Sequence, residues 1–154
     1  MKKHVYLIKN LSVWSVCAIA LSAWPAAAAD ITVKQLNNGK DGQMVFEPSY
    51  VKAAVGDTIV FQSTEKGAHQ SMSLLVPTGA KTWNGPMDAD FKVKVEKEGV
   101  YLYSCLPHKA MGMVGVIQVG QPTNLAEAKA AATKEQAGFA MNKTRFDMAL
   151  AKVK

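Results

Sequence analysis

Short stretches in which apolar and polar residues alternate fill most of the chain, and turn residues separate them. Residues 31–36 alternate before the turn residues 37–42, and Phe91, Val93 and Val95 alternate with charged residues. Further apolar runs lie at 44–46, 50–55, 58–61, 100–104 and 114–119. Alternation with a period of two predicts half-buried strands. Because no helical pattern interrupts these strands, the sequence predicts an all-β fold, an antiparallel β-sandwich.

The last part of the chain, residues 121–154, has a helical pattern that is rich in alanine, lysine and glutamate. Thr123 or Asn124 can cap one helix, and the capping box Thr133-Lys134-Glu135-Gln136 predicts the start of a second. We therefore predict a sandwich domain over residues 30–120 and a helical extension over 121–154. Apolar residues near helical spacing predict a stripe that packs on the sandwich; these are Phe139, Phe146, Leu150 and Val153.

The first residues have the pattern of an export signal. A positively charged start, an apolar run over residues 11–25 and four alanines at 26–29 describe a cleavable secretory signal peptide. The apolar run is too short for a membrane anchor. We predict cleavage after Ala28 or Ala29, so that residues 1–29 form a signal peptide and the mature protein has no membrane segment.

Charge and cysteine content limit the possible partners of the mature chain. The formal net charge is +6, and removal of the signal takes three lysines and no acid, which leaves +3. No run of Lys or Arg is present that could follow a phosphate backbone, which argues against nucleic acid. A protein partner with an acidic face fits better. Cys17 leaves with the signal, so the single remaining cysteine, Cys105, cannot form an internal disulfide.

That cysteine belongs to a pattern of metal ligands. Cys105 ends one predicted strand, His108 follows after two residues, and Met113 opens the next strand, so one loop carries three donors. Met111 is an alternative thioether on the same loop. His69 is the only other histidine after the signal. One thiolate, two imidazoles and a distant thioether form a blue-copper electron-transfer site. Such a site has no open position for a substrate, which argues against an enzyme.

Several segments carry a resemblance to a known family. They are residues 39–42, 44–48, 55–58, 66–67, the loop 105–115, residues 119–120 and the start of the helical tail at 124–125. With these segments the chain resembles the cupredoxins and, among them, is similar to the pseudoazurin family. The resemblance implies a Greek-key cupredoxin fold and one type 1 copper ion per chain. The implied copper ligands are His69, Cys105, His108 and Met113.

The resemblance also implies where the protein works and with which partners. It implies a bacterial periplasmic electron carrier that receives electrons from a cytochrome or another carrier. The implied acceptor is a redox enzyme such as copper nitrite reductase. A carrier must expose one face to two partners in turn, so we expect a monomer.

Four positions depart from the family pattern. Ala68 stands between Gly67 and His69, and Gln70 replaces an asparagine. Lys109 and Ala110 replace an aromatic residue and a glycine that are common in the loop. These changes concern the surroundings of the copper ligands more than the ligands themselves. We expect the backbone N–H of residue 70 still to reach the cysteine sulfur.

The resemblance further implies a docking surface around the edge of His108. Met44, Pro107 and Met111 would form an apolar patch there, although Met44 could equally be a core residue. Three lysines could surround the patch and attract an acidic partner; they are Lys40, Lys66 and Lys109.

Other functions are compatible with the same residues. Cys105 could be a nucleophile that His108 activates, as in a thiol enzyme. The same donors could serve a copper storage or delivery protein, which would release Cu(I) readily to a chelator. They could also bind zinc. An intense thiolate-to-copper absorption band would distinguish the electron carrier from all three.

Overall fold

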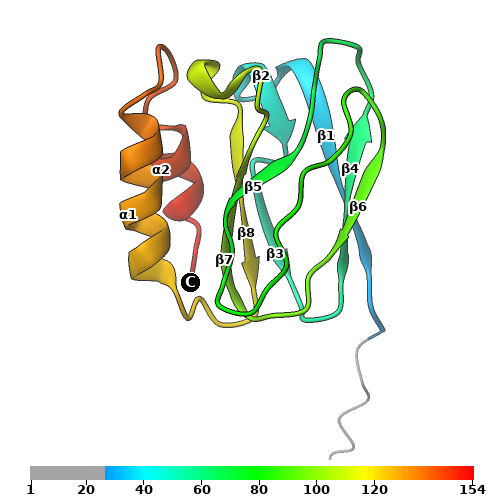
Figure 1. The fold of residues 1–154 in the computed structure, drawn as a ribbon, viewed down its shortest axis with the longest axis vertical. Helices are drawn as coiled ribbons and strands as arrows, with labels where there is room; N and C mark the ends of the chain where they lie inside the picture. Colours follow the sequence, from blue (N-terminus) through cyan, green and yellow to red (C-terminus); the bar gives the residue numbers. More distant parts are fainter. Residues whose placement is uncertain (1–26) are drawn as a thin grey trace, which may run out of the picture.

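The computed structural model describes residues 27–154, so almost all of the predicted signal peptide lies outside the described part of the chain. Two four-stranded sheets face each other (Figure 1). The first sheet has the order β2-β1-β4-β6, with β1 Asp30–Gly39, β2 Gly42–Glu47, β4 Thr58–Ser63 and β6 Phe91–Lys94. The second has the order β3-β8-β7-β5, with β3 Tyr50–Ala53, β8 Val114–Val119, β7 Gly99–Ser104 and β5 Met72–Leu75.

Strand pairing confirms the predicted sandwich and adds one feature. Most neighbouring strands are antiparallel, but β1 pairs with β4, and β3 with β8, in parallel. Both parallel pairs join strands that are not consecutive in the chain, because the chain changes sheet between them. Alternation of apolar residues specifies which side of a strand is buried and not the direction of its neighbour, so the sequence pattern could not predict these two pairs.

The central strands β7 and β8 are buried on both sides, which explains their continuous apolar runs. Tyr101 and Tyr103 belong to the core between the sheets, whereas Val100 and Leu102 belong to a second core on the outer side. Gly115 lies opposite Tyr103 in the register of β7 and β8. A Cβ at this glycine would lie 2.3 Å from atoms of the tyrosine ring, so only glycine fits.

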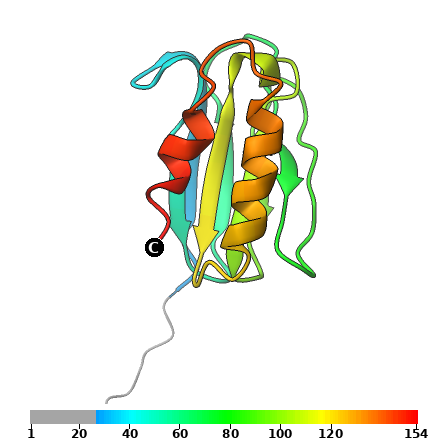
Figure 2. The same cartoon turned by 90° about the vertical axis from the view of Figure 1, so that its left-hand side faces the viewer.

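Two helices cover the outer side of β7 and β8: α1 Leu125–Gln136 and α2 Arg145–Leu150 (Figure 2). Ala128 and Ala132 of α1 are fully buried, and such small side chains let the helix lie close to the sheet. The predicted apolar stripe is confirmed, with Val153 partly buried at its end. Its other members are buried in the second core: Phe139, Phe146 and Leu150.

The predicted helix boundaries need one correction. The capping box at Thr133 is wrong, because α1 continues through Gln136 and the Thr133 hydroxyl donates to the Lys129 carbonyl inside the helix. The second helix begins only at Arg145. The buried residues Ala128, Ala132 and Gln136 share one face of α1, so packing on the sheet favours a helix that runs past the local capping signal.

Asn124 precedes α1 as predicted, but its side chain does not cap the helix. Its Oδ1 accepts a hydrogen bond from the Val100 amide at 2.7 Å, and its Nδ2 donates to the Val100 carbonyl at 3.0 Å. The side chain thus extends the sheet hydrogen bonding of β7 to the start of the helical tail. No helix in the described part of the chain combines the length and apolar character needed to cross a bilayer.

Candidate metal centre

A tight loop between β7 and β8 carries Cys105, His108 and Met113. The Cys105 amide donates to the Met113 carbonyl at 2.9 Å, and the Met113 amide donates to the His108 carbonyl at 3.2 Å. Between them the 3₁₀ helix Lys109–Met111 ends at Gly112, which has a left-handed φ of 71°. Glycine adopts this conformation without steric cost. The loop therefore returns the chain to the sheet so that Met113 lies next to the start of the loop.

His69 comes from a different loop, between β4 and β5. The Asp88 carboxylate accepts hydrogen bonds from three successive amides of this loop, those of Gly67, Ala68 and His69, at 3.3, 3.1 and 2.9 Å. The Asp88 amide in turn donates to the His69 carbonyl at 2.7 Å. These hydrogen bonds, above all that from the His69 amide, lower the pKa of Asp88. The additional Ala68 fits into this arrangement with a left-handed φ of 59°.

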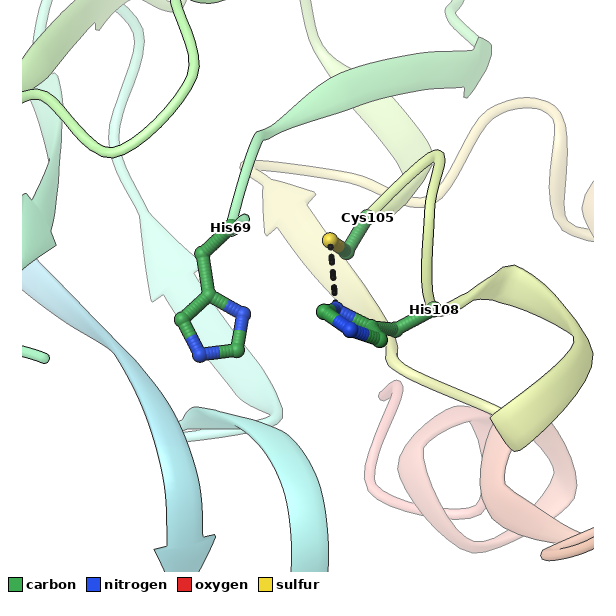
Figure 3. A group of neighbouring side chains, drawn as sticks. All are labelled: His69, Cys105 and His108. Atoms are coloured by element: carbon green, nitrogen blue, oxygen red, sulfur yellow. Dashed lines mark hydrogen bonds between the residues drawn. The ribbon is translucent and has the colours of Figure 1, made fainter. Parts of the chain in front are cut away.

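The two loops bring three potential ligands together, as Figure 3 shows. One ligand atom from each of His69, Cys105 and His108 lies within 4.8 Å of the other two. The Cys105 sulfur lies 3.4 Å from Nδ1 of His108. Cys105 and His69 are fully buried, while His108 is only partly buried. Among these three residues, only His108 is partly exposed.

The buried imidazole is oriented by Asn37 at the end of β1. Its Nε2 lies 3.0 Å from Oδ1 of Asn37, a hydrogen-bond acceptor, so the proton is expected on Nε2. Nδ1 of His69 is buried and has no hydrogen-bond partner among residues 27–154. Burial and the neighbouring His108 lower the pKa of His69, which favours the neutral form. A neutral imidazole with a free Nδ1 is ready to bind a metal ion.

The Cys105 sulfur lies in an environment that suits a metal-bound thiolate. Burial raises the pKa of the thiol, and hydrogen bonds from the backbone amides of Gln70 and His108 partly offset this effect. This effect agrees with the expected approach of the residue 70 amide, and the sulfur also lies 3.8 Å from the Ala68 carbonyl, to which the thiol can donate. The Gln70 side chain points elsewhere, donating to Asn84 and to the Gly85 carbonyl. A bound metal ion supplies the positive charge that deprotonates a buried thiol.

The two candidate thioethers differ in their surroundings. Met113 is fully buried in the same core cluster as Cys105. Met111 lies in the 3₁₀ helix and is partly exposed. A thiolate, two imidazoles and a buried thioether make a soft donor set that fits copper.

The surroundings of His108 agree only in part with the predicted docking surface. Pro107 is exposed, and Met44 is partly buried and packs against the sandwich core. Lys66 donates to the Asp88 carbonyl at 2.6 Å, and Lys109 forms an ion pair with Glu135 of α1. Lys40 is exposed on the turn between β1 and β2. Two of the three predicted lysines are thus engaged with neighbouring groups.

Sequence reasoning did not find the residues that support the ligands. Asn37 falls among the predicted turn residues, yet β1 continues through it to Gly39. Asp88 lies in an irregular segment with no recognisable motif. Both are 19 or more positions away from His69 in the chain, and only the fold brings them to it.

Comparison with known proteins agrees with the fold and the donor set. Residues 33–120 match the model of the family described as copper binding proteins, plastocyanin/azurin family. A structure of pseudoazurin from Hyphomicrobium denitrificans superimposes with a TM-score of 0.73 and 35% identity, covering 81% of this chain and 98% of that one. The two sheets and the His-Cys-His cluster are those of a cupredoxin, a small copper protein that transfers electrons.

Two relatives show to which family of these copper proteins the chain belongs. A pseudoazurin of Paracoccus pantotrophus is 36% identical over 94% of this chain and 97% of its own length. A protein named putative pseudoazurin of Rhizobium leguminosarum bv. viciae is 38% identical over 88% of both chains. The chain belongs to the pseudoazurin family. Its cofactor is one type 1 copper ion, and the cluster of His69, Cys105 and His108 is consistent with such a site.

Proposed function

We propose that this protein is a periplasmic carrier of single electrons that holds copper through His69, Cys105, His108 and Met113. The observation that carries the proposal is the asymmetry of the site. Three of these residues are fully buried, and only His108 is partly exposed. Such a site offers a route for an electron but no position for a substrate, so we propose no enzymatic activity.

Met113 is the proposed axial ligand. Met113 is buried in the same core cluster as Cys105, whereas Met111 is partly exposed. A weak thioether ligand in a dry environment tunes the reduction potential of type 1 copper. Met111 then remains available for the apolar surface around His108.

The surrounding residues keep the ligands in one arrangement. Copper bound here supplies the chemistry by alternating between Cu(II) and Cu(I). Asp88 fixes the backbone of His69 through three amides, and Asn37 fixes its ring. The Cys105–Met113 hydrogen bond fixes the other loop. Ligands that are held in place move little when the charge of the metal changes, which favours fast electron transfer.

The proposed partners and location follow from the family and the predicted signal. The signal at residues 1–29 would direct the chain to the periplasm of a bacterium. We propose a cytochrome or similar carrier as donor and an enzyme such as copper nitrite reductase as acceptor, with docking at the exposed edge of His108. A monomer fits a carrier that presents this same edge to both partners.

The first test is a visible spectrum of the purified mature protein with one equivalent of Cu(II). We expect an intense thiolate-to-copper band that a reductant bleaches. Cys105→Ser should abolish the band, Met113→Ala should change it, and the matched control Met111→Ala should leave it nearly unchanged. A colourless wild-type protein would contradict the proposal, and a changed band in Met111→Ala alone would reassign the axial ligand.

One alternative, a copper storage or delivery protein, has a separate test. An electron carrier should retain its copper through repeated cycles of reduction and reoxidation in the presence of a Cu(I) chelator. A delivery protein should lose Cu(I) to the chelator within the first cycles. The buried positions of Cys105 and His69 favour retention, because the copper would have to leave through the His108 side.

A further inference from the structure

The connection between α1 and α2 runs along the copper-ligand loop (Figure 2). Groups of this connection and of Arg145, the first residue of α2, donate hydrogen bonds to three successive carbonyls of that loop. The Ala140 amide donates to the Ala110 carbonyl at 2.7 Å, and Nδ2 of Asn142 donates to the Met111 carbonyl at 2.8 Å. Nη1 of Arg145 donates to the Gly112 carbonyl at 2.9 Å.

Arg145 also binds a second segment, the turn between β1 and β2 together with the start of β2. Its guanidinium donates to the Met44 carbonyl at 2.7 Å and to the carbonyls of Asp41 and Gln43, each at 3.0 Å. The residue is only 6% exposed, and it forms no ion pair with a carboxylate among residues 27–154. One buried side chain therefore joins the helical tail, the turn and the ligand loop.

Packing alone does not require a charged residue at this position. Burying a guanidinium lowers its pKa and costs free energy, and apolar replacements of buried charges are often neutral or stabilising. Helix α2 already has Phe146, Ala149 and Leu150 to anchor it on the sheet. What the arginine adds is a rigid planar group with several donors, which fixes carbonyls of separate segments at defined distances.

The fixed carbonyls lie directly beside the proposed axial ligand. Gly112 precedes Met113, and a Cβ on this glycine would lie 2.9 Å from the Asn142 Cβ. The tail and the loop are thus in close contact at this point. A change in the position of Gly112 must move the backbone of Met113, because the two residues share a peptide bond.

We propose that the helical extension positions the copper-ligand loop, with Arg145 and Asn142 as the positioning residues. They hold the carbonyls of residues 110–112 and thereby set the placement of Met113 relative to Cys105. The buried positive charge of Arg145 also favours Cu(I) over Cu(II) and so raises the reduction potential. The spectroscopic part of this proposal rests on the proposed function, because it requires a type 1 copper site.

The test compares Arg145→Met, Arg145→Lys and Asn142→Ala with the control Leu150→Ala. Leu150 anchors the same helix in the second core but donates nothing to the loop. We expect Arg145→Met to change the ratio of the two thiolate-to-copper bands and to lower the reduction potential. Arg145→Lys keeps the charge, so its reduction potential should stay close to that of the wild type. Its band ratio should still differ from that of the wild type. Leu150→Ala should lower the thermal midpoint and leave both readouts unchanged.

A second readout does not depend on copper. In the metal-free protein, amide hydrogen exchange of residues 111–113 should be faster in Arg145→Met and Asn142→Ala than in the wild type. In Leu150→Ala, the exchange rates of residues 111–113 should not rise above wild-type values by more than those of amides elsewhere in the protein. Asn142 is exposed and its replacement removes one hydrogen bond, so this variant gives an answer even where Arg145→Met fails to fold.

The outcomes separate this proposal from the proposed function. If the wild type shows the intense band and Asn142→Ala and Arg145→Lys both match it in spectrum and in hydrogen exchange, the tail only packs on the sheet and the positioning role is wrong. If the wild type lacks the band, the proposed function fails, while faster exchange of residues 111–113 in the variants would still support the positioning of the loop.

Discussion

At the scale of single residues, the two histidines of the candidate metal centre differ in burial and in the groups that contact them. His69 is fully buried, and Asn37 and Asp88 fix its ring and its backbone. His108 is partly exposed, and its Nδ1 faces the Cys105 sulfur. In the proposed function, the first histidine is therefore the firmly held ligand, and the second is the one through which a partner would reach the metal. The support of His69 by a single amide oxygen can be tested directly.

Replacing Asn37 with alanine should weaken copper binding. The variant loses the acceptor that holds the Nε2 proton of His69, so the ring can rotate and change tautomer. Loss of such a supporting hydrogen bond reduces metal affinity by about 10- to 100-fold. Competition with a Cu(I) chelator measures the affinity. The control is Asn38→Ala, which changes an exposed neighbour and should bind copper as the wild type does; equal affinities in both variants would rule out the role of Asn37.

At the scale of elements, long-range side-chain hydrogen bonds connect loops to distant strands. Besides Asp88 and Arg145, Asp57 does this at the opposite end of the sandwich. Its carboxylate accepts hydrogen bonds from the Ala29 amide at 2.9 Å and the Ala54 amide at 2.8 Å. It thereby joins the start of β1 to the turn between β3 and β4. Two carboxylates that accept hydrogen bonds, Asp57 and Asp88, and one guanidinium that donates them, that of Arg145, thus hold the loops on the sheets.

Asp57 should make the stability of the protein depend on pH. The hydrogen bonds from Ala29 and Ala54 lower the pKa of this carboxyl below its usual value of about 3.9. A group with a lowered pKa in the folded state contributes stability above the unfolded pKa, and this contribution is lost as the pH falls through the folded pKa. Near neutral pH, the free energy of unfolding of Asp57→Asn should be about 1–2 kcal/mol lower than that of the wild type. This difference should shrink below about pH 4.

Urea unfolding of the metal-free protein at a series of pH values measures this difference without interference from acid release of copper. Asp30→Asn is a suitable control, because Asp30 forms an exposed salt bridge with Lys92 that should contribute little. A difference for Asp57→Asn that stays constant from pH 7 to pH 3 would show that the carboxylate charge is not what stabilises the turn.

The elements also show which parts of the structure the sequence could predict. The strands β1, β4, β7 and β8 and the ligand loop follow from local patterns, because alternation and ligand spacing lie within a few residues. Strand β5 was missed, since all of its residues are partly buried and show no alternation. The start of α2 was placed too early, because a local capping motif at Thr133 competed with packing that only the folded protein provides.

The candidate site also has a part that the sequence could predict and a part that it could not. Cys105 and His108 share one loop, and His69 is the only other histidine after the signal, so the sequence predicted the cluster. The residues that orient the cluster are Asn37 and Asp88, and the fold brings them from other segments. Polar residues of this kind occur in many turns, so a single sequence gives no signal for them.

At the scale of the whole molecule, the metal centre occupies one end of the sandwich and β1 begins at the other (Figure 1). The start of β1 therefore lies away from the ligand loop between β7 and β8. Electrostatic attraction of a partner depends on the charges around this edge, which include the ion pair of Lys109 with Glu135. Lys109 was predicted to attract an acidic partner, and its pairing means that its charge is partly balanced locally.

The balance between Lys109 and Glu135 can be measured with a small anionic oxidant such as hexacyanoferrate(III). At low ionic strength, Lys109→Gln should slow oxidation of the reduced copper protein and Glu135→Gln should speed it, each by a factor of about three, because one charge near the edge changes. The double variant should react almost as the wild type does. All rates should converge at high salt, since screening removes the attraction between separated charges.

Lys94→Gln is the control for this series, because β6 pairs Lys94 with Thr58 near the start of β1, far from the metal centre. Its oxidation rate should change much less than that of Lys109→Gln. If Lys94→Gln and Lys109→Gln slow the reaction equally, only the net charge of the molecule matters. Electrons would then not need to leave at the His108 edge, and the asymmetry of the site would lose its functional meaning.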